Sequence, residues 1–102
     1  MKQDSVENLE KLGLAAAHDV AGPDAVEQVE VVTGVDYFGR DTYDFSFLID
    51  RARLRQRIGM VLIRLGQRLD DDLSAVGDEH HVEVHLLGRN DWPRRASART
   101  VV

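Results

Sequence analysis

The fold is decided by residues 42–69, TYDFSFLIDRARLRQRIGMVLIRLGQRL, in which the hydrophobic repeat changes from two residues to 3.6. The first eight residues alternate as in a half-buried strand, whose apolar side holds Tyr43, Phe45, Phe47 and Ile49. Asp50 then suits the N-cap of a helix that runs to about residue 69, or to 73. We expect its apolar stripe to be buried against the sheet, at Leu54, Ile58, Val61, Leu62, Leu65 and Leu69.

Elements on both sides of this stretch complete an α-β-β-α-β order. A capping box, Asp4 with Glu7, begins a helix over about residues 5–20, and Gly22 with Pro23 ends it. Residues 26–33 and 80–87 alternate like residues 42–49 and predict two more strands. Since every strand has one apolar and one mostly polar face, we predict an α+β domain. Two helices pack on one face of its three-stranded sheet, and the other face is open.

The chain of 102 residues is long enough for one domain. We expect residues 1–88 to form it and the Arg-rich residues 89–102 to be a loosely held tail. A right-handed parallel crossover would allow the third strand to lie beside the first. The three aspartates at 70–72 are unfavourable at the negative end of a helix, so we expect the long helix to fray or stop there.

Composition excludes several classes of function. The sequence has no cysteine, which rules out disulfides, a thiolate nucleophile and a Cys-based zinc site. No apolar run approaches the roughly 20 residues of a membrane span, and no signal region is recognisable at the N-terminus. There is no glycine-rich phosphate loop and no nucleophile elbow around a serine. We therefore expect a cytoplasmic protein that is not an enzyme and needs no cofactor.

Charge is segregated along the chain. Residues 51–69 contain six arginines and no acid, whereas residues 70–83 contain six acids and no base, within a net charge of −5. Such blocks indicate either pairing within the molecule or a surface with two faces of opposite sign.

Several apolar residues are expected on the surface. Met60 and Ile63 fall outside the helix stripe, and Val32, Leu48 and Leu87 fall on the outward face of the sheet. Apolar residues grouped on one surface favour a protein contact. Our main hypothesis is a small non-catalytic interaction or accessory module that self-associates, for example as a homodimer, through the open sheet face or the helix edge.

A nucleic-acid-binding accessory domain is the first alternative. At helical spacing, one basic stripe beside the apolar one is formed by Arg53, Arg57, Arg64 and Arg68. Arg94 and Arg95 in the tail would extend it. An acidic chain with a pI near 5.2 argues against this function. The structural interpretation is that Glu7, Glu10 and nearby acids of the first helix neutralise the stripe.

A metal-binding domain is the second alternative. On a strand, His81, Glu83 and His85 point to the same side, and histidine and carboxylate are ligands of first-row metals. Glu30 or Asp44 would supply a further ligand from across the sheet. A solvated strand face with polar alternation explains the same pattern without a metal.

Overall fold

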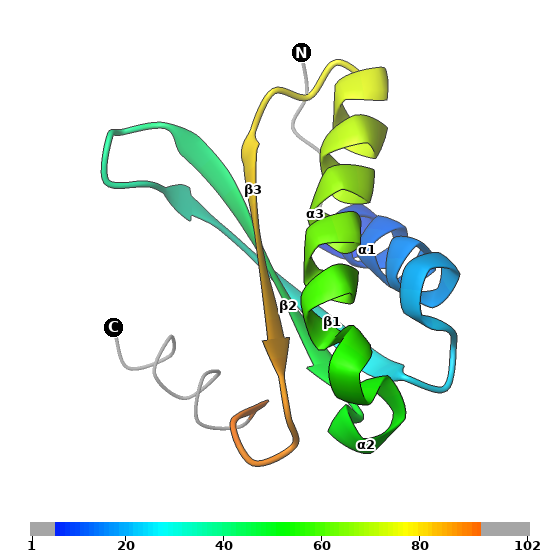
Figure 1. Cartoon of the computed structure of the whole chain (residues 1–102). Coiled ribbons are helices and arrows are strands. Elements are labelled where there is room, and N and C mark those ends of the chain that lie inside the picture. The colour runs from blue at the N-terminus through cyan, green and yellow to red at the C-terminus, as the bar shows by residue number, and fades with distance from the viewer. Residues whose placement is uncertain (1–5, 93–102) are drawn as a thin grey trace.

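Residues 6–92 are described by the structure, a computed structural model of the chain. The elements in chain order are α1 (Val6–Ala21), β1 (Val26–Val35), β2 (Asp41–Ile49), α2 (Arg51–Leu54), the 3₁₀ turn η1 (Arg55–Arg57), α3 (Ile58–Ala75) and β3 (His81–Leu87). Helices α1 and α3 contact each other and cover the same face of the sheet, α1 over β1 and α3 over β3 (Figure 1). The predicted α+β class and α-β-β-α-β order are confirmed.

Strand β2 lies at the centre of the sheet, in the order β1-β2-β3. It pairs antiparallel with β1, with Val31 opposite Phe45, and parallel with β3, with Val84 opposite Phe45. The third strand therefore lies beside the second strand and not beside the first. Its central position agrees with its sequence, because β2 carries the aromatic side chains of the core.

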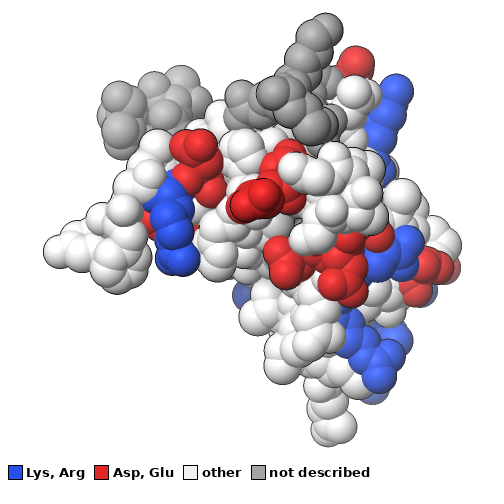
Figure 2. Space-filling model, turned by 90° about the horizontal axis from the view of Figure 1, so that it is seen from above, with Lys and Arg blue, Asp and Glu red and all other residues white. Residues whose placement is uncertain are grey.

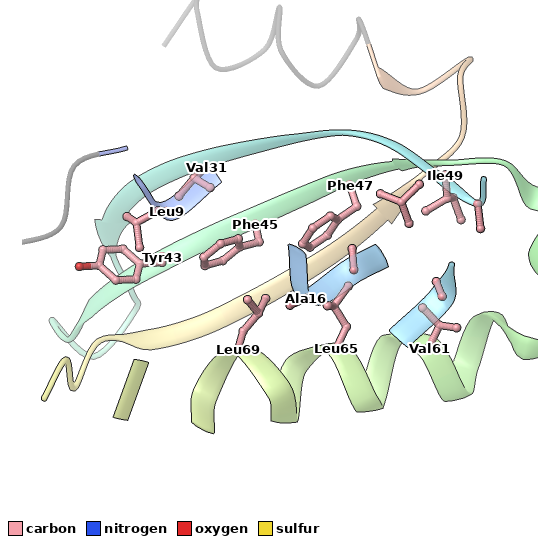
Figure 3. Packing of buried hydrophobic residues seen from close by; sticks show 14 of the residues in the cluster. Leu9, Ala16, Val31, Tyr43, Phe45, Phe47, Ile49, Val61, Leu65 and Leu69 are labelled. Atoms are coloured by element: carbon pink, nitrogen blue, oxygen red, sulfur yellow. The ribbon is translucent and has the colours of Figure 1, made fainter. Parts of the chain in front are cut away.

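The core lies between the inward face of the sheet and the two helices. Tyr43, Phe45 and Phe47 of β2 are fully buried and point towards the helices (Figure 3). The buried residues of α3 that meet them follow a four-residue spacing, namely Val61, Leu65, Leu69 and Leu73. Helix α1 approaches the sheet at Gly13, where an added Cβ would lie 2.9 Å from the Phe45 ring.

The predicted helix of residues 51–69 is interrupted. Asp50 caps α2, accepting a hydrogen bond from the Ala52 N–H at 3.0 Å, but Arg55 then adopts a φ of 49° and α3 begins only at Ile58. The predicted burial of Leu62 is wrong, because 39% of this residue is exposed. Leu62 follows Val61 by about 100° around the helix and falls outside the side that faces the sheet.

Helix α3 also continues through the three aspartates, to Ala75, and does not end before them. Arg68 compensates for this acidic stretch: its Nε donates to Asp72 at 3.0 Å, and its Nη1 donates to Asp19 of α1. The hydrogen bonds to Asp19 and then Asp72 raise the pKa of Arg68 above its ordinary value. Arg68 thus joins the two helices. It also offsets the unfavourable position of the Asp72 carboxylate near the negative end of α3.

Candidate functional site

The open face of the sheet carries a cluster of three possible ligands. Asp44 on β2 and Glu83 on β3 are opposite each other in the parallel register, and His85 follows on β3. The His85 Nε2 lies 3.0 Å from the Asp44 Oδ1 and 3.9 Å from the Glu83 Oε1. One ligand atom from each residue fits within 4.8 Å of the others. We call these three residues the sheet cluster.

The structure therefore unites part of the predicted metal set. Glu83 and His85 lie together, and Asp44 completes the group from the neighbouring strand, as one of the two cross-strand ligands considered. His81 lies opposite Thr42, is exposed and is not part of the cluster. Glu30 lies opposite Ser46 on the other side of β2 and also stays outside it. Only the register between β2 and β3 identifies the third partner, and the sequence does not reveal that register.

The predicted partner-binding residues separate into two groups. On the sheet, Leu48 is buried, with 4% exposed, and Val32 and Leu87 are only partly exposed. The expected exposure of Leu48 is wrong because β2 is the central strand and Gln28 and Leu87 flank it in the register. On α3, by contrast, Met60 and Ile63 are exposed, as expected. The open sheet face thus offers little apolar area, and the helix offers more than predicted.

The predicted arginine stripe is not continuous. Arg53 lies on α2 and Arg57 on η1, whereas Arg64 and Arg68 lie on α3 beyond the interruption. Arg68 is held by Asp19 and Asp72, so Asp19 takes the neutralising role that we expected of Glu7 and Glu10. Arg94 and Arg95 lie outside the described residues. At the other end of α3, Figure 2 shows acidic side chains grouped on the surface.

A polar cluster that the sequence did not predict lies where β3 begins. The Tyr43 hydroxyl donates to the Asp78 Oδ2 at 2.7 Å, and the His80 N–H donates to the Asp78 Oδ1 at 3.0 Å. The His80 Nδ1 lies 2.6 Å from the same Oδ1, and the His80 ring stacks on Tyr43 with centroids 4.1 Å apart. The one available signal was Tyr43 itself, since a tyrosine on a buried strand face needs a partner for its hydroxyl.

Asp78 makes this cluster sensitive to acid. Burial raises the pKa of Asp78, but the hydrogen bonds from Tyr43 and His80 outweigh it and hold the pKa below the ordinary value of 3.8. A carboxylate whose pKa is depressed by folding stabilises the protein fully above its unfolded pKa. That stabilisation is lost as the pH falls through the folded-state pKa.

We expect Asp78→Asn to lower the free energy of unfolding by about 1–3 kcal/mol at pH 7, because the amide replaces one of the two acceptor oxygens with an NH₂ group and leaves either Tyr43 or His80 without its acceptor. The deficit relative to the wild type should shrink as the pH falls below about 4 and through the depressed folded-state pKa of Asp78. Urea unfolding at several pH values measures both effects. The exposed Asp24→Asn is the control, with an expected change within about 0.5 kcal/mol. An equal loss in both variants would contradict the role of Asp78.

Asp36 organises the turn of the hairpin between β1 and β2. The Asp36 carboxylate accepts hydrogen bonds from the N–H groups of Arg40 and Phe38 and from the Arg40 side chain, at 2.8–2.9 Å. These bonds, the Arg40 N–H first, hold the pKa of Asp36 below its ordinary value. Beside this turn, Tyr37 and Phe38 are 96% and 78% exposed and pack edge to face.

Comparisons of the chain with protein-family models, with curated proteins and with solved structures find no match. Within residues 6–92, no helix has both the length and the apolar character needed to cross a membrane. Inferences about function therefore depend on the surfaces described above.

Proposed function

We propose that this protein is a small interaction module that self-associates through the outward side of α3. The observation that carries the proposal is the exposure of three large apolar side chains on the first half of this helix. Met60, Leu62 and Ile63 are 46%, 39% and 63% exposed. Together with Gly59 and Gly66 they form a surface that we call the α3 patch. Grouped apolar residues of this kind are typical of protein contacts.

The two glycines of the α3 patch support a close contact with another chain. A Cβ added at Gly59 or Gly66 would meet nothing within 4 Å, so neither glycine is required by packing within the monomer. Each costs about 1 kcal/mol relative to alanine inside a helix. A second backbone that approaches closely would explain why small residues flank the apolar side chains.

Charge complementarity favours a second copy of this chain as the occupant. Arg55 and Arg57 precede the α3 patch, Asp70 and Asp71 follow it, and all four are exposed. If a two-fold axis passes near Ile63, the arginines of one copy face the aspartates of the other, and the same contact occurs twice. The pair of helices is then antiparallel. The aspartates at one end also make the surface unsuitable for a nucleic-acid backbone.

The size of the patch sets the expected strength of this contact. Helix α3 has 18 residues and is about 27 Å long, and one helix face buries less than the roughly 800 Å² per partner of a standard interface. We therefore expect a dissociation constant in the micromolar range. Sedimentation velocity over a concentration series should show a shift from a species of 11.5 kDa to one of twice that mass.

Ile63→Glu should leave the protein monomeric, since it places a charge at the centre of an apolar contact. The matched control is Val76→Glu, which alters another exposed β-branched residue, 55% exposed, beyond the end of α3. The control should associate like the wild type. Circular dichroism verifies that both variants are folded. A wild type that stays monomeric at several hundred micromolar would overturn the proposal.

Charge reversal tests the antiparallel arrangement. Asp70→Arg with Asp71→Arg, and separately Arg55→Asp with Arg57→Asp, should each weaken self-association, because each places like charges opposite one another at both ends. An equimolar mixture of the two double variants should restore a dimer, which is then heteromeric. If the mixture stays monomeric while the wild type dimerises, another surface or another orientation makes the contact.

A further inference from the structure

We propose that the sheet cluster, Asp44, Glu83 and His85, binds a divalent first-row transition-metal ion on the face of the sheet opposite the helices. This site is separate from the α3 patch, which lies on a helix that covers the other face. It also differs from the set of His81, Glu83 and His85 that the spacing along one strand indicated.

The geometry of the cluster suits three ligands of one ion. Neighbouring ligands that each lie about 2.1 Å from a metal are roughly 3–3.5 Å apart. The His85 Nε2 is 3.0 Å from the Asp44 Oδ1 and 3.9 Å from the Glu83 Oε1. Small rotations of the carboxylate side chains therefore bring all three donors to bonding distance, without any movement of the strands.

The backbone placement of these residues is fixed by the sheet. Asp44 belongs to the central strand, which has a hydrogen-bonded neighbour on each side, and Glu83 lies opposite it in the register. The inward neighbours of Asp44 along β2, Tyr43 and Phe45, are fully buried. Donors that stand on packed strands are held in position before an ion arrives, which reduces the entropic cost of binding.

Electrostatics favours a cation at this point. Asp44 and Glu83 place two carboxylates opposite each other on adjacent strands, where like charges repel each other. A ring nitrogen of an imidazole offers a lone pair to a metal ion. A divalent ion supplies two positive charges between the carboxylates and accepts that lone pair. The cluster is thus better matched to a divalent metal ion than to a monovalent one.

The donor set indicates the class of metal. Imidazole suits zinc, nickel, copper and iron, whereas carboxylates alone suit magnesium, calcium and manganese. One imidazole with two carboxylates favours a divalent transition ion over calcium or magnesium. The side chains of His85, Asp44 and Glu83 are 33%, 29% and 47% exposed, so water completes the coordination shell.

The test uses zinc chloride as the probe and the full chain without a histidine tag. An ion that binds only the folded state raises the melting temperature in proportion to the logarithm of its concentration. We expect saturable stabilisation and, by isothermal titration calorimetry, one ion per chain. His85→Ala should abolish both, and the near-isosteric Glu83→Gln should weaken the affinity at least tenfold while the metal-free melting temperature stays close to that of the wild type.

His81→Ala is the matched control, because His81 lies on the same strand but outside the cluster. It should bind zinc like the wild type. Loss of binding in His81→Ala with retention in His85→Ala would overturn this assignment of ligands. No stabilisation by zinc at millimolar concentration would overturn the site itself. The monomeric variant Ile63→Glu should still bind zinc, so failure of either proposal is distinguishable from failure of the other.

Discussion

Leu65→Ala should lower the free energy of unfolding by about 2–5 kcal/mol, the range for a leucine removed from a packed core. Leu65 is completely buried and its side chain points from α3 to the sheet (Figure 3). The substitution loses the transfer free energy of the side chain and leaves a cavity between the helix and the aromatic residues of β2. Chemical denaturation at a fixed pH and a low protein concentration measures the loss.

The control for this experiment is Leu62→Ala, three positions earlier on the same helix. Because Leu62 is 39% exposed, its truncation should cost the monomer less than about 1 kcal/mol. The two variants make the same chemical change, so the difference between them reports which side of α3 faces the sheet. Equal losses, or a larger loss for Leu62→Ala, would show that the helix is rotated from the position described.

Gly13→Val should destabilise the domain by about 1–3 kcal/mol or more, because it overpacks the contact between α1 and the sheet. A Cβ at this position would lie 2.9 Å from two atoms of the Phe45 ring. Phe45 is completely buried, stacks on Phe47 and meets Tyr43 edge to face, so its ring has little room to retreat. Either α1 lifts away from the sheet or the aromatic residues are displaced.

Ala15→Val separates this steric effect from helix propensity. Ala15 lies on the exposed side of α1, so the new valine loses only a few tenths of a kcal/mol of propensity. Replacement of glycine by valine gains propensity, yet Gly13→Val should be the less stable variant. Thermal unfolding of both variants suffices. A Gly13→Val protein as stable as the wild type would mean that α1 does not cross the sheet at this residue.

Local patterns predicted the elements because they act within a few residues. The alternation of residues 42–49 and the N-cap at Asp50 depend only on neighbouring positions, and both are present in the structure. The order of the strands cannot be predicted from such local patterns, since it depends on which strands lie beside β2. Leu62 is a second example. It belongs to the apolar stripe of the sequence, but whether its side of α3 is covered depends on where α1 and the sheet end.

The candidate sites were predicted in part, and the missing parts were also long-range. Glu83 and His85 could be recognised on one strand. Asp44 joins them because it pairs with Glu83, which is 39 positions away in the sequence. The interruption at Arg55 removed the continuity of the arginine stripe, and no proline or glycine marks it. Tyr43 and Asp78 meet across a similar separation, and Asp78 by itself resembles an ordinary turn residue.

The parallel pairing of β2 with β3 has a consequence for how the chain folds. Val35 and Asp41, which close the β1–β2 hairpin, are six positions apart, whereas the first partners of β2 and β3, Thr42 and His81, are 39 apart. The entropic cost of loop closure is therefore small for the hairpin and larger for β3. We therefore expect the β1–β2 hairpin to form before β3 joins the sheet, which stopped-flow refolding of hairpin and β3 variants would test. In that order of events, the carboxylate and imidazole donors of the sheet cluster come together only when β3 pairs with β2.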